Sequence, residues 1–187
     1  ASVVVMIDGE ESARYALNKD AEIVIKNGDS FNTLVIKDGV ASIGSFTAKF
    51  PNLSGEVVIP ASVTYIGQEA FQNAPITKLT FAPGGTEKLC IAPGAFKNIA
   101  VEEIILPDSL EYLDGGNFWN SEYAKNEENW DGYGLYAGNI LIQSRPAFEA
   151  PDVEAIVIRE GTTLIATGSF YGYNKAKTIT FPESLLH

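Results

Sequence analysis

Apolar positions recur along this chain at nearly constant intervals. We take the last residue of each apolar run as an anchor, and the anchors lie 23, 22, 25, 52 and 23 residues apart, at Ile36, Ile59, Phe81, Leu106, Ile158 and Phe181. Another apolar residue lies two places before each anchor, at Leu34, Val57, Leu79, Ile104, Ile156 and Ile179. The spacing predicts a tandem repeat of about 23 residues in five to six copies.

The copies also share positions after the anchor. An apolar residue lies seven places on, at Ile43, Ile66, Leu113 and Ile165, and a Phe lies twelve places on, at Phe71, Phe118 and Phe170. The third copy keeps this order after a three-residue insertion, at Ile91 and Phe96, and the first copy is looser, with Phe46 and Phe50 near the aromatic position. We expect these side chains to be directed into the core.

The spacing within a copy predicts its local structure. An anchor and the residue two places before it lie on the same side of an extended strand, so both enter the core. Pro60, Pro107 and Pro182 follow an anchor, and a Pro without an N–H ends a strand ladder there. A second short extended run comes next, and "QEAFQNA" at 68–74 suits a single helical turn. Because so small a unit cannot bury its apolar edge alone, we predict a solenoid whose equivalent strands pair in parallel.

Residues 1–30 do not fit the repeat. "SVVVMI" at 2–7 and "AEIVIK" at 21–26 are typical of strands. Between them "EESARYALNK" places Ala13, Ala16 and Leu17 on one face of a helix. We predict an N-terminal cap over residues 1–30 that covers the open end of the repeats, which occupy 31–187.

The 52-residue interval holds an insertion at about 119–151. "GLYAGNILIQ" predicts a hairpin, since Gly138-Asn139 suits a two-residue turn with Gly first. Aromatic residues gather in the insertion and in the equivalent loop of the next copy: Trp119, Tyr123, Trp130, Tyr133, Tyr136, Tyr171 and Tyr173. Such residues are common anchors for protein or sugar partners, and they also hold long loops in place. The sequence leaves both interpretations open.

At "IPASVTYIGQEAF" (59–71) and "ILPDSLEYLDGGNF" (105–118) the chain resembles the leucine-rich repeats of the BspA type. The signature of that family is roughly LxxIxLPxSLxxIGxxAFxxC, and the match covers about 34–118 and 152–186, although the closing Cys is absent from every copy. The resemblance implies a β-rich α/β fold, a right-handed solenoid used for binding. It also implies a place on the cell surface or outside the cell, mostly in bacteria, with adhesion to host proteins as the usual role.

Composition narrows the classes of partner. The formal net charge of −11 argues against nucleic acids and anionic membrane surfaces as partners. No apolar run approaches the roughly 20 residues that span a bilayer. The opening "ASVVVMIDGE" has no basic residues before its apolar run and no initiator Met, so we expect a mature or trimmed chain whose signal peptide is absent.

Catalytic chemistry is poorly supported. The one histidine is His187 and the one cysteine is Cys90, which argues against Ser-His and Cys-His nucleophiles and against Cys/His metal sites. "NEENWDG" at 126–132 lacks the alternating spacing of a calcium loop. We therefore expect no enzyme, no cofactor and no metal site.

Two outward surfaces are predicted as well. The residue before each anchor is β-branched, at Val35, Val58, Thr80, Ile105, Val157 and Thr180, and alternation directs these side chains away from the core. Cys90 aligns with Tyr65 and Tyr112 in a second outward row. The β-branched row reflects strand propensity or forms a docking face.

These observations lead to three functional hypotheses. The first is a non-enzymatic protein-binding module, and the second is a carbohydrate-binding module that uses the aromatic insertion. The third is a structural spacer that self-associates weakly through its C-terminal strand, where "ITFPESLLH" at 179–187 starts a sixth copy and the strand edge is either a cap or open to another chain.

Overall fold

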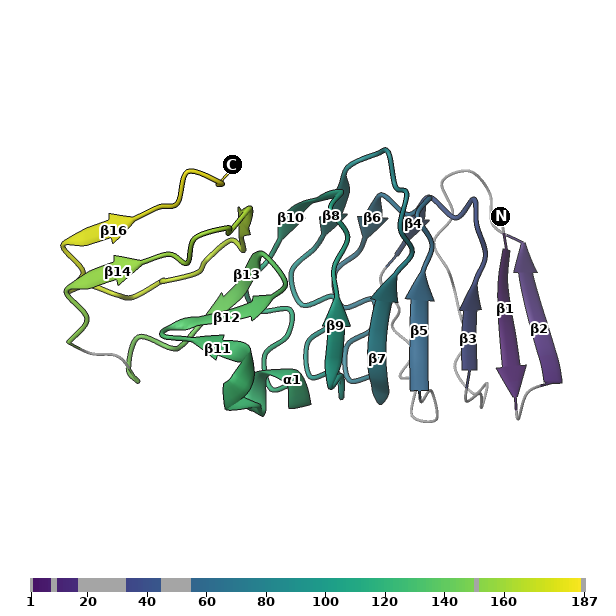
Figure 1. Ribbon diagram of the computed structural model, residues 1–187. Helices are drawn as coiled ribbons and strands as arrows, with labels where there is room; N and C mark the ends of the chain where they lie inside the picture. The colour runs from purple at the N-terminus through teal and green to yellow at the C-terminus, as the bar shows by residue number, and fades with distance from the viewer. Residues whose placement is uncertain (1, 8–9, 17–32, 45–54, 150–151, 186–187) are drawn as a thin grey trace.

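The strands of the molecule are stacked in a row that runs from the N-terminal to the C-terminal end (Figure 1). The computed structural model describes residues 2–7, 10–16, 33–44, 55–149 and 152–185. Within these ranges the chain is a β-rich solenoid, as the repeat predicts, and its only helices are α1 (Glu122–Lys125) and the 3-10 turn η1 (Glu127–Asn129). Phe46 and Phe50 lie outside the described residues.

Equivalent strands of successive copies form two parallel sheets. The first sheet has the order β5-β7-β9, from β5 (Gly55–Ile59), β7 (Ile76–Phe81) and β9 (Glu103–Ile105). The second sheet has the order β10-β8-β6-β4, from β4 (Ser42–Ile43), β6 (Tyr65–Ile66), β8 (Leu89–Ile91) and β10 (Leu110–Leu113). In the first sheet Val57 aligns with Leu79 and Leu79 with Ile104. The predicted parallel register is confirmed.

The predicted core positions lie between the two sheets. Val57, Ile59 and Leu79 are 0% exposed, and the aromatic positions Phe71, Phe96 and Phe118 are fully buried as well. The three rings stack one repeat apart, with centroid separations of 5.4 and 5.6 Å and interplanar angles of 5°. Each buried ring removes about 150–250 Å² of surface from water, so this aromatic column is a large part of what holds successive copies together.

The segments around the aromatic positions form turns rather than the single helical turns expected from sequence. Asn73, Asn98 and Asn120, each two places after the buried Phe, have φ of 60°, 56° and 62°. Asn tolerates this left-handed backbone better than most residues. A residue with this φ cannot continue a right-handed helix, so the chain forms a turn. The exposed amides also join the copies: Asn98 Nδ2 donates to Asn73 Oδ1 (3.0 Å), and Asn120 Nδ2 donates to Asn98 Oδ1 (3.4 Å).

The N-terminal part is a hairpin added to the first repeat strand. β1 (Ser2–Ile7) pairs antiparallel with β2 (Glu10–Ala16) and with β3 (Thr33–Ile36). The strand at 2–7 is confirmed, and the helix expected over 10–19 is wrong for 10–16, where pairing with β1 forms a strand. The strand expected at 21–26 lies outside the described residues, and the division at residue 30 stays a prediction.

The insertion contains β11 (Trp130–Asp131), β12 (Gly134–Ala137) and β13 (Ile140–Ser144). β12 and β13 pair antiparallel, with Ala137 opposite Ile140, so the predicted hairpin and its two-residue turn are confirmed. Gly138 has a φ of 59°, a conformation that suits Gly at this position of the turn.

Beyond the insertion the repeat resumes with β14 (Ala155–Val157), β15 (Leu164–Ile165) and β16 (Thr178–Thr180). β14 and β16 pair in parallel and form a separate two-stranded sheet. Ile156 and Ile158 are buried as expected, but Ile179 and Phe181 are 44% and 55% exposed. Their prediction as core was wrong, because no described strand lies beyond β16 to cover them.

Candidate functional site

The first sheet is interrupted at β9. This strand pairs with β7 on one side, whereas the equivalent strand of the next copy, β14, pairs only with β16. Among the described strands none pairs with the second edge of β9. The insertion lies between the two strands in sequence, and it replaces a regular step of the solenoid (Figure 1).

Beyond the second sheet, the inserted hairpin belongs to a separate sheet of order β11-β12-β13-β15. β13 pairs in parallel with β15, with Ile140 opposite Leu164. A little further along the same chain segment, Thr167 bridges to Asp114, and its N–H donates to Leu113 O at 2.7 Å. The strands β10 and β15 therefore meet at one end and are separated by the hairpin at the other.

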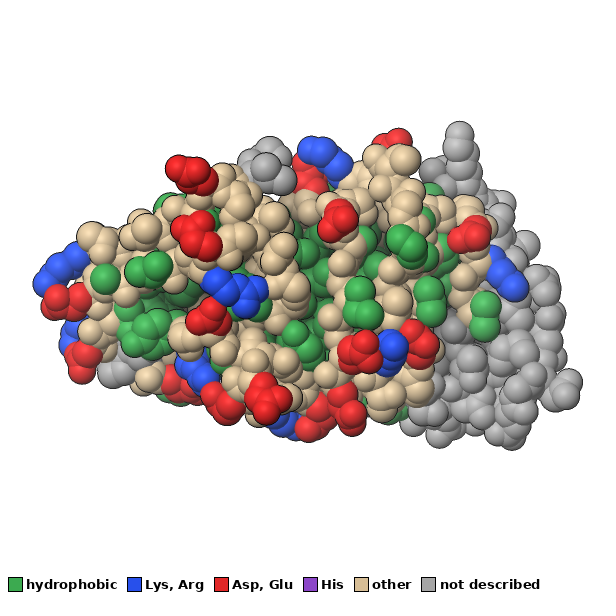
Figure 2. Space-filling model, in the orientation of Figure 1, with side chains coloured by type: hydrophobic (Ala, Val, Ile, Leu, Met, Phe, Trp, Pro, Cys, Tyr) green, Lys and Arg blue, Asp and Glu red, His purple; other side chains and the backbone are tan. Residues whose placement is uncertain are grey.

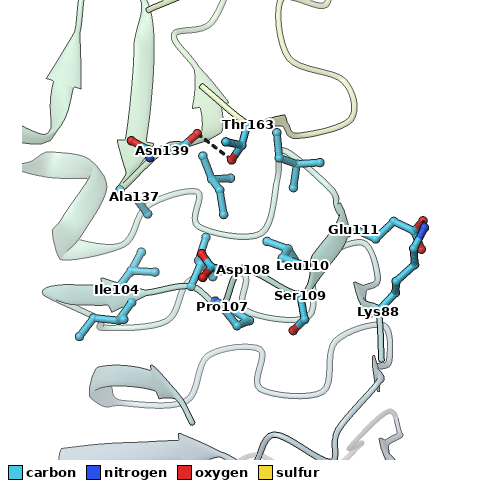
Figure 3. A pocket seen from close by; sticks show the side chains of 15 residues that line it. Lys88, Ile104, Pro107, Asp108, Ser109, Leu110, Glu111, Ala137, Asn139 and Thr163 are labelled. Atoms are coloured by element: carbon cyan, nitrogen blue, oxygen red, sulfur yellow. Dashed lines mark hydrogen bonds and ion pairs between the residues drawn. The ribbon is translucent and has the colours of Figure 1, made fainter. Parts of the chain in front are cut away.

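A groove of about 720 Å³ lies between the β9–β10 segment and the inserted hairpin. Its walls come from the end of β9, the β9–β10 turn, the β12–β13 turn and the start of β15 (Figure 3). The lining is Ile104, Ile105, Leu106, Pro107, Asp108, Ser109, Leu110, Glu111, Ala137, Gly138, Asn139, Ile140, Thr163, Leu164 and Lys88. Figure 2 shows apolar side chains in the hollow beside the first sheet. The groove is apolar inside, with charged groups on its rim.

Hydrogen bonds and an ion pair define the groove walls. Thr163 N–H donates to Asn139 O (2.9 Å), which fixes the hairpin turn against the loop before β15. Lys88 pairs with Glu111 at the opposite wall (Figure 3). Asp108 is exposed and has no ion pair among the described residues.

The predicted β-branched row faces outward beside this groove. Val58 and Ile105 are 45% and 46% exposed, and Thr80 lies between them in register and is half-buried. Val157 is 74% exposed, but the interruption after β9 separates it from the other three. The outward orientation is confirmed, and we name Val58, Thr80 and Ile105 the outer row.

A second outward row lies on the opposite sheet. Cys90 aligns with Tyr65 and with Tyr112, as predicted. The two tyrosines are 46% and 37% exposed, and the thiol of Cys90 is free. This row offers a matched control surface for mutations in the outer row.

Three of the predicted aromatic residues hold the insertion in place. Tyr123 donates its hydroxyl hydrogen to Tyr136 O (2.6 Å), and Trp130 Nε1 donates to Ala124 O (2.8 Å). The guanidinium of Arg145 lies 4.3 Å from the ring centroid of Trp130. Tyr136 is only 6% exposed. All three residues thus make internal contacts that fix the loop.

The other predicted aromatics are more accessible. Tyr133 is 41% exposed and meets Tyr173 edge-on at 6.3 Å, while the hydroxyl of Tyr173 donates to Arg145 O (2.9 Å). Tyr171 is 90% exposed. Trp119 is half-buried, and it lines a hollow of about 330 Å³ together with Tyr171. The other residues that line this hollow are Asp114, Gly115, Gly116, Gln143, Ser144, Arg145, Pro146, Thr167, Gly168 and Ser169.

Burial affects the titration of two of these residues. It raises the pKa of Tyr123, and the positive charge of Arg159 opposes part of that rise. Burial likewise raises the pKa of Tyr173, while a hydrogen bond with Ser144 lowers it. Both phenols are therefore neutral at physiological pH, and Tyr123 stays a donor to Tyr136 O.

The described residues contain no group of three or more His, Cys, Asp or Glu side chains placed to hold a metal ion. In the same part of the chain, no helix has the length and apolar character of a membrane span.

Sequence reasoning missed the groove and the unpaired edge of β9. The 52-residue interval signalled an interruption, but the position of the inserted hairpin depends on contacts that lie far apart in sequence. It also missed the hydrogen bonds that join Asn73, Asn98 and Asn120 across copies. The recurring "FQN", "FKN" and "FWN" at 71–73, 96–98 and 118–120 could have indicated this row of asparagines.

Comparison with known proteins gives one family. The model described as "BspA type Leucine rich repeat region" matches residues 24–126 and 142–187 in six copies. Among solved structures, the crystal structure of the pneumococcal vaccine antigen PcpA is similar, at 20% identity and a TM-score of 0.35. The alignment covers 88% of this chain and 56% of that chain, so this chain spans little more than half of its length. No curated protein matches.

Proposed function

Because this chain belongs to the BspA-type leucine-rich repeat family, we propose that it is a non-enzymatic module that binds a protein partner. The family is in general one of non-catalytic repeat solenoids, and such repeats typically mediate protein binding. We further propose a place on the bacterial cell surface or outside the cell, with a host extracellular protein as one kind of partner.

The observation that carries the proposal is the outer row and the groove beside it. Val58 and Ile105 present apolar side chains on a hydrogen-bonded sheet, and the row ends at an apolar hollow. Contiguous apolar surface next to a concave site is typical of protein-binding faces. Loss of this surface from water is the main source of affinity that it offers.

The test is a binding assay with matched variants on the two sheets. The chain is immobilised and a panel of extracellular matrix and serum proteins is passed over it. Val58→Glu with Ile105→Glu is expected to weaken binding of any partner at least tenfold, because each change places a charge in a desolvated interface. Tyr65→Glu with Tyr112→Glu, at similar exposure on the other sheet, is expected to leave it unchanged. Equal effects of the two pairs would contradict use of the outer row.

A carbohydrate-binding role is the second candidate, and one arrangement favours it. Trp119 and Tyr171 line one hollow together with Asp114, Gln143 and Ser144. An aromatic face beside carboxylate, amide and hydroxyl groups suits a sugar ring, which has apolar C–H faces and polar edges. Quenching of tryptophan fluorescence by free oligosaccharides, lost in Trp119→Ala and retained in Trp130→Phe, would support this role.

The spacer hypothesis depends on β16. Thr178, Ile179 and Thr180 are exposed, and β16 pairs only with β14 among the described strands. A free edge can pair with another chain, which would give weak self-association. Sedimentation at high protein concentration tests this hypothesis, and a single monomeric species would contradict it.

A further inference from the structure

The second edge of β9 presents hydrogen-bonding groups that no described strand uses. Ala82 N–H donates to Ile59 O (2.8 Å), so the groups of Ala82 and Thr80 are directed toward β5 and those of Leu79 toward β9. In a parallel ladder Leu79 bonds to the two residues that flank its partner Ile104, which are Glu103 and Ile105. The N–H and C=O of Ile104 are therefore directed at the open side. The start of this edge is already occupied, because Tyr123 N–H donates to Val101 O (2.8 Å). Within β9 (Glu103–Ile105) the unpaired groups are therefore the N–H and C=O of Ile104.

The groove lies directly beside this edge. Leu106 continues from β9 into the groove wall and is only half-buried, whereas the equivalent anchors Ile59 and Ile158 are 0% and 2% exposed. Ala137 and Ile140 form the opposite wall. The missing element is thus a strand: its backbone would pair with β9, and its inward side chains would cover Leu106.

Two negatively charged side chains near this edge favour a peptide that carries positive charges. Glu102 immediately precedes β9 and Asp108 lies in the β9–β10 turn; both are exposed, and neither has an ion-pair partner among the described residues. The neighbouring Glu103 is already paired with Lys78 (3.4 Å). The net charge of −11 also disfavours pairing of this edge with another copy of the same chain.

We propose that the groove binds an extended peptide segment of a partner protein by strand addition to β9. The segment alternates apolar and small polar residues, and it carries Lys or Arg at each end. Its backbone pairs with Ile104, its apolar side chains enter the groove, and its basic ends meet Glu102 and Asp108. This inference rests on the proposed protein-binding function and names the chemical class of the partner at one site.

A direct test uses the probe peptide Lys-Val-Thr-Val-Ser-Val-Lys, labelled with fluorescein, and measures fluorescence anisotropy with the full chain. Binding is expected to weaken with salt, because the end contacts are exposed ion pairs. A peptide with Glu at both ends is expected to bind at least about tenfold more weakly. The same loss is expected for a peptide with alternate backbone amides N-methylated, since it cannot complete the ladder.

The matched control is a peptide in which the other set of alternate amides is N-methylated. Successive amides of an extended peptide are directed to opposite sides, so one set faces β9 and the other faces away from it. We expect methylation of the first set to lower affinity about tenfold or more and methylation of the second set to change it less than threefold. Asp108→Lys tests the contribution of the basic peptide ends, and near-ultraviolet circular dichroism checks the fold of this variant.

Residue-resolved hydrogen exchange distinguishes strand addition from adsorption in the groove. The peptide is expected to slow exchange of the Ile104 amide and to leave that of Ile105, which is already paired with β7, unchanged. Equal affinity of the two N-methylated peptides, or no added protection at Ile104, would overturn the proposal. So would a concentration-dependent dimer of the chain in which the Ile104 amide is protected without peptide, because the occupant would then be a second copy. If a protein partner binds through the outer row while no peptide binds, the proposed function stands and only this inference fails.

Discussion

Asn117 is a buried polar residue that links two copies of the repeat. Its side chain is 0% exposed; its Oδ1 accepts from Phe96 N–H (3.1 Å), and its Nδ2 donates to Ala92 O (3.2 Å) and Asp114 O (3.0 Å). The side chain therefore satisfies backbone groups of the preceding copy that no water can reach. A buried donor left without a partner costs about 1–3 kcal/mol.

We expect Asn117→Ala to lower the free energy of unfolding by about 2–4 kcal/mol, because it orphans the Phe96 N–H and leaves a small cavity. Urea titration followed by circular dichroism measures this change. Asn174→Ala, at an exposed position, is the control, and it should stay within about 0.5 kcal/mol of wild type. Equal losses for the two variants would show that Asn117 contributes no more than a surface amide.

Tyr123 gives the molecule a specific response to alkaline pH. Burial raises its pKa in the folded chain above the usual 10.0, so folding favours the neutral phenol. The resulting stabilisation is fully present below pH 10.0 and is lost as the pH rises through the raised pKa. The phenolate would also lose its role as donor to Tyr136 O.

The expected result is a thermal midpoint that falls more steeply between about pH 9 and pH 12 in wild type than in Tyr123→Phe. Tyr173 has a pKa shifted in the same direction, so part of the fall remains in the variant. Tyr171→Phe, with a side chain that is 90% exposed, serves as the control and should keep the wild-type slope. Parallel slopes for wild type and Tyr123→Phe would contradict the account.

Single residues show why some predictions succeeded and others could not. The Phe column was visible because its side chains repeat at a fixed interval, and burial follows directly from that period. Asn117 occupies the position that Ala70 and Ala95 hold in the preceding copies, so its difference is visible in sequence. Its hydrogen bonds to Phe96 and Ala92 depend on how two copies stack, and the local sequence does not predict this stacking.

At the scale of elements, the sequence was most informative where one interaction dominates. The hairpin at 134–144 was predictable because Gly138-Asn139 and the flanking apolar runs favour one turn. The strand β2 was not, because the helical spacing of Ala13 and Ala16 is weak and antiparallel pairing with β1 decided the structure. The open edge of β9 was also unpredictable, since it depends on where the inserted hairpin packs.

The described residues form two buried clusters. The larger one extends from Ile36 to Ala166, includes the Phe column and continues past the interruption through Leu135, Ile142 and Leu164. The smaller one consists of Tyr136, Leu141, Val153, Ile156 and Ile158, with Phe170 and Tyr173 among the partly buried side chains packed against it. Because repeats are stabilised mainly by their nearest neighbours, a break in the first sheet should reduce the coupling between these cores.

We therefore expect the C-terminal core to open at a lower urea concentration than the central one. Ile156→Ala should destabilise the smaller core by about 2–4 kcal/mol and speed hydrogen exchange at Ile158, whose N–H donates to Thr180 O (2.9 Å). The same change should leave exchange at Leu79, in the first sheet, near its wild-type rate. Phe96→Ala, in the middle of the stacked column, should have the opposite pattern, with faster exchange at Leu79 and a smaller effect at Ile158. If both variants speed exchange equally at the two positions, the solenoid unfolds as one unit, and the interruption at β9 is local to the groove.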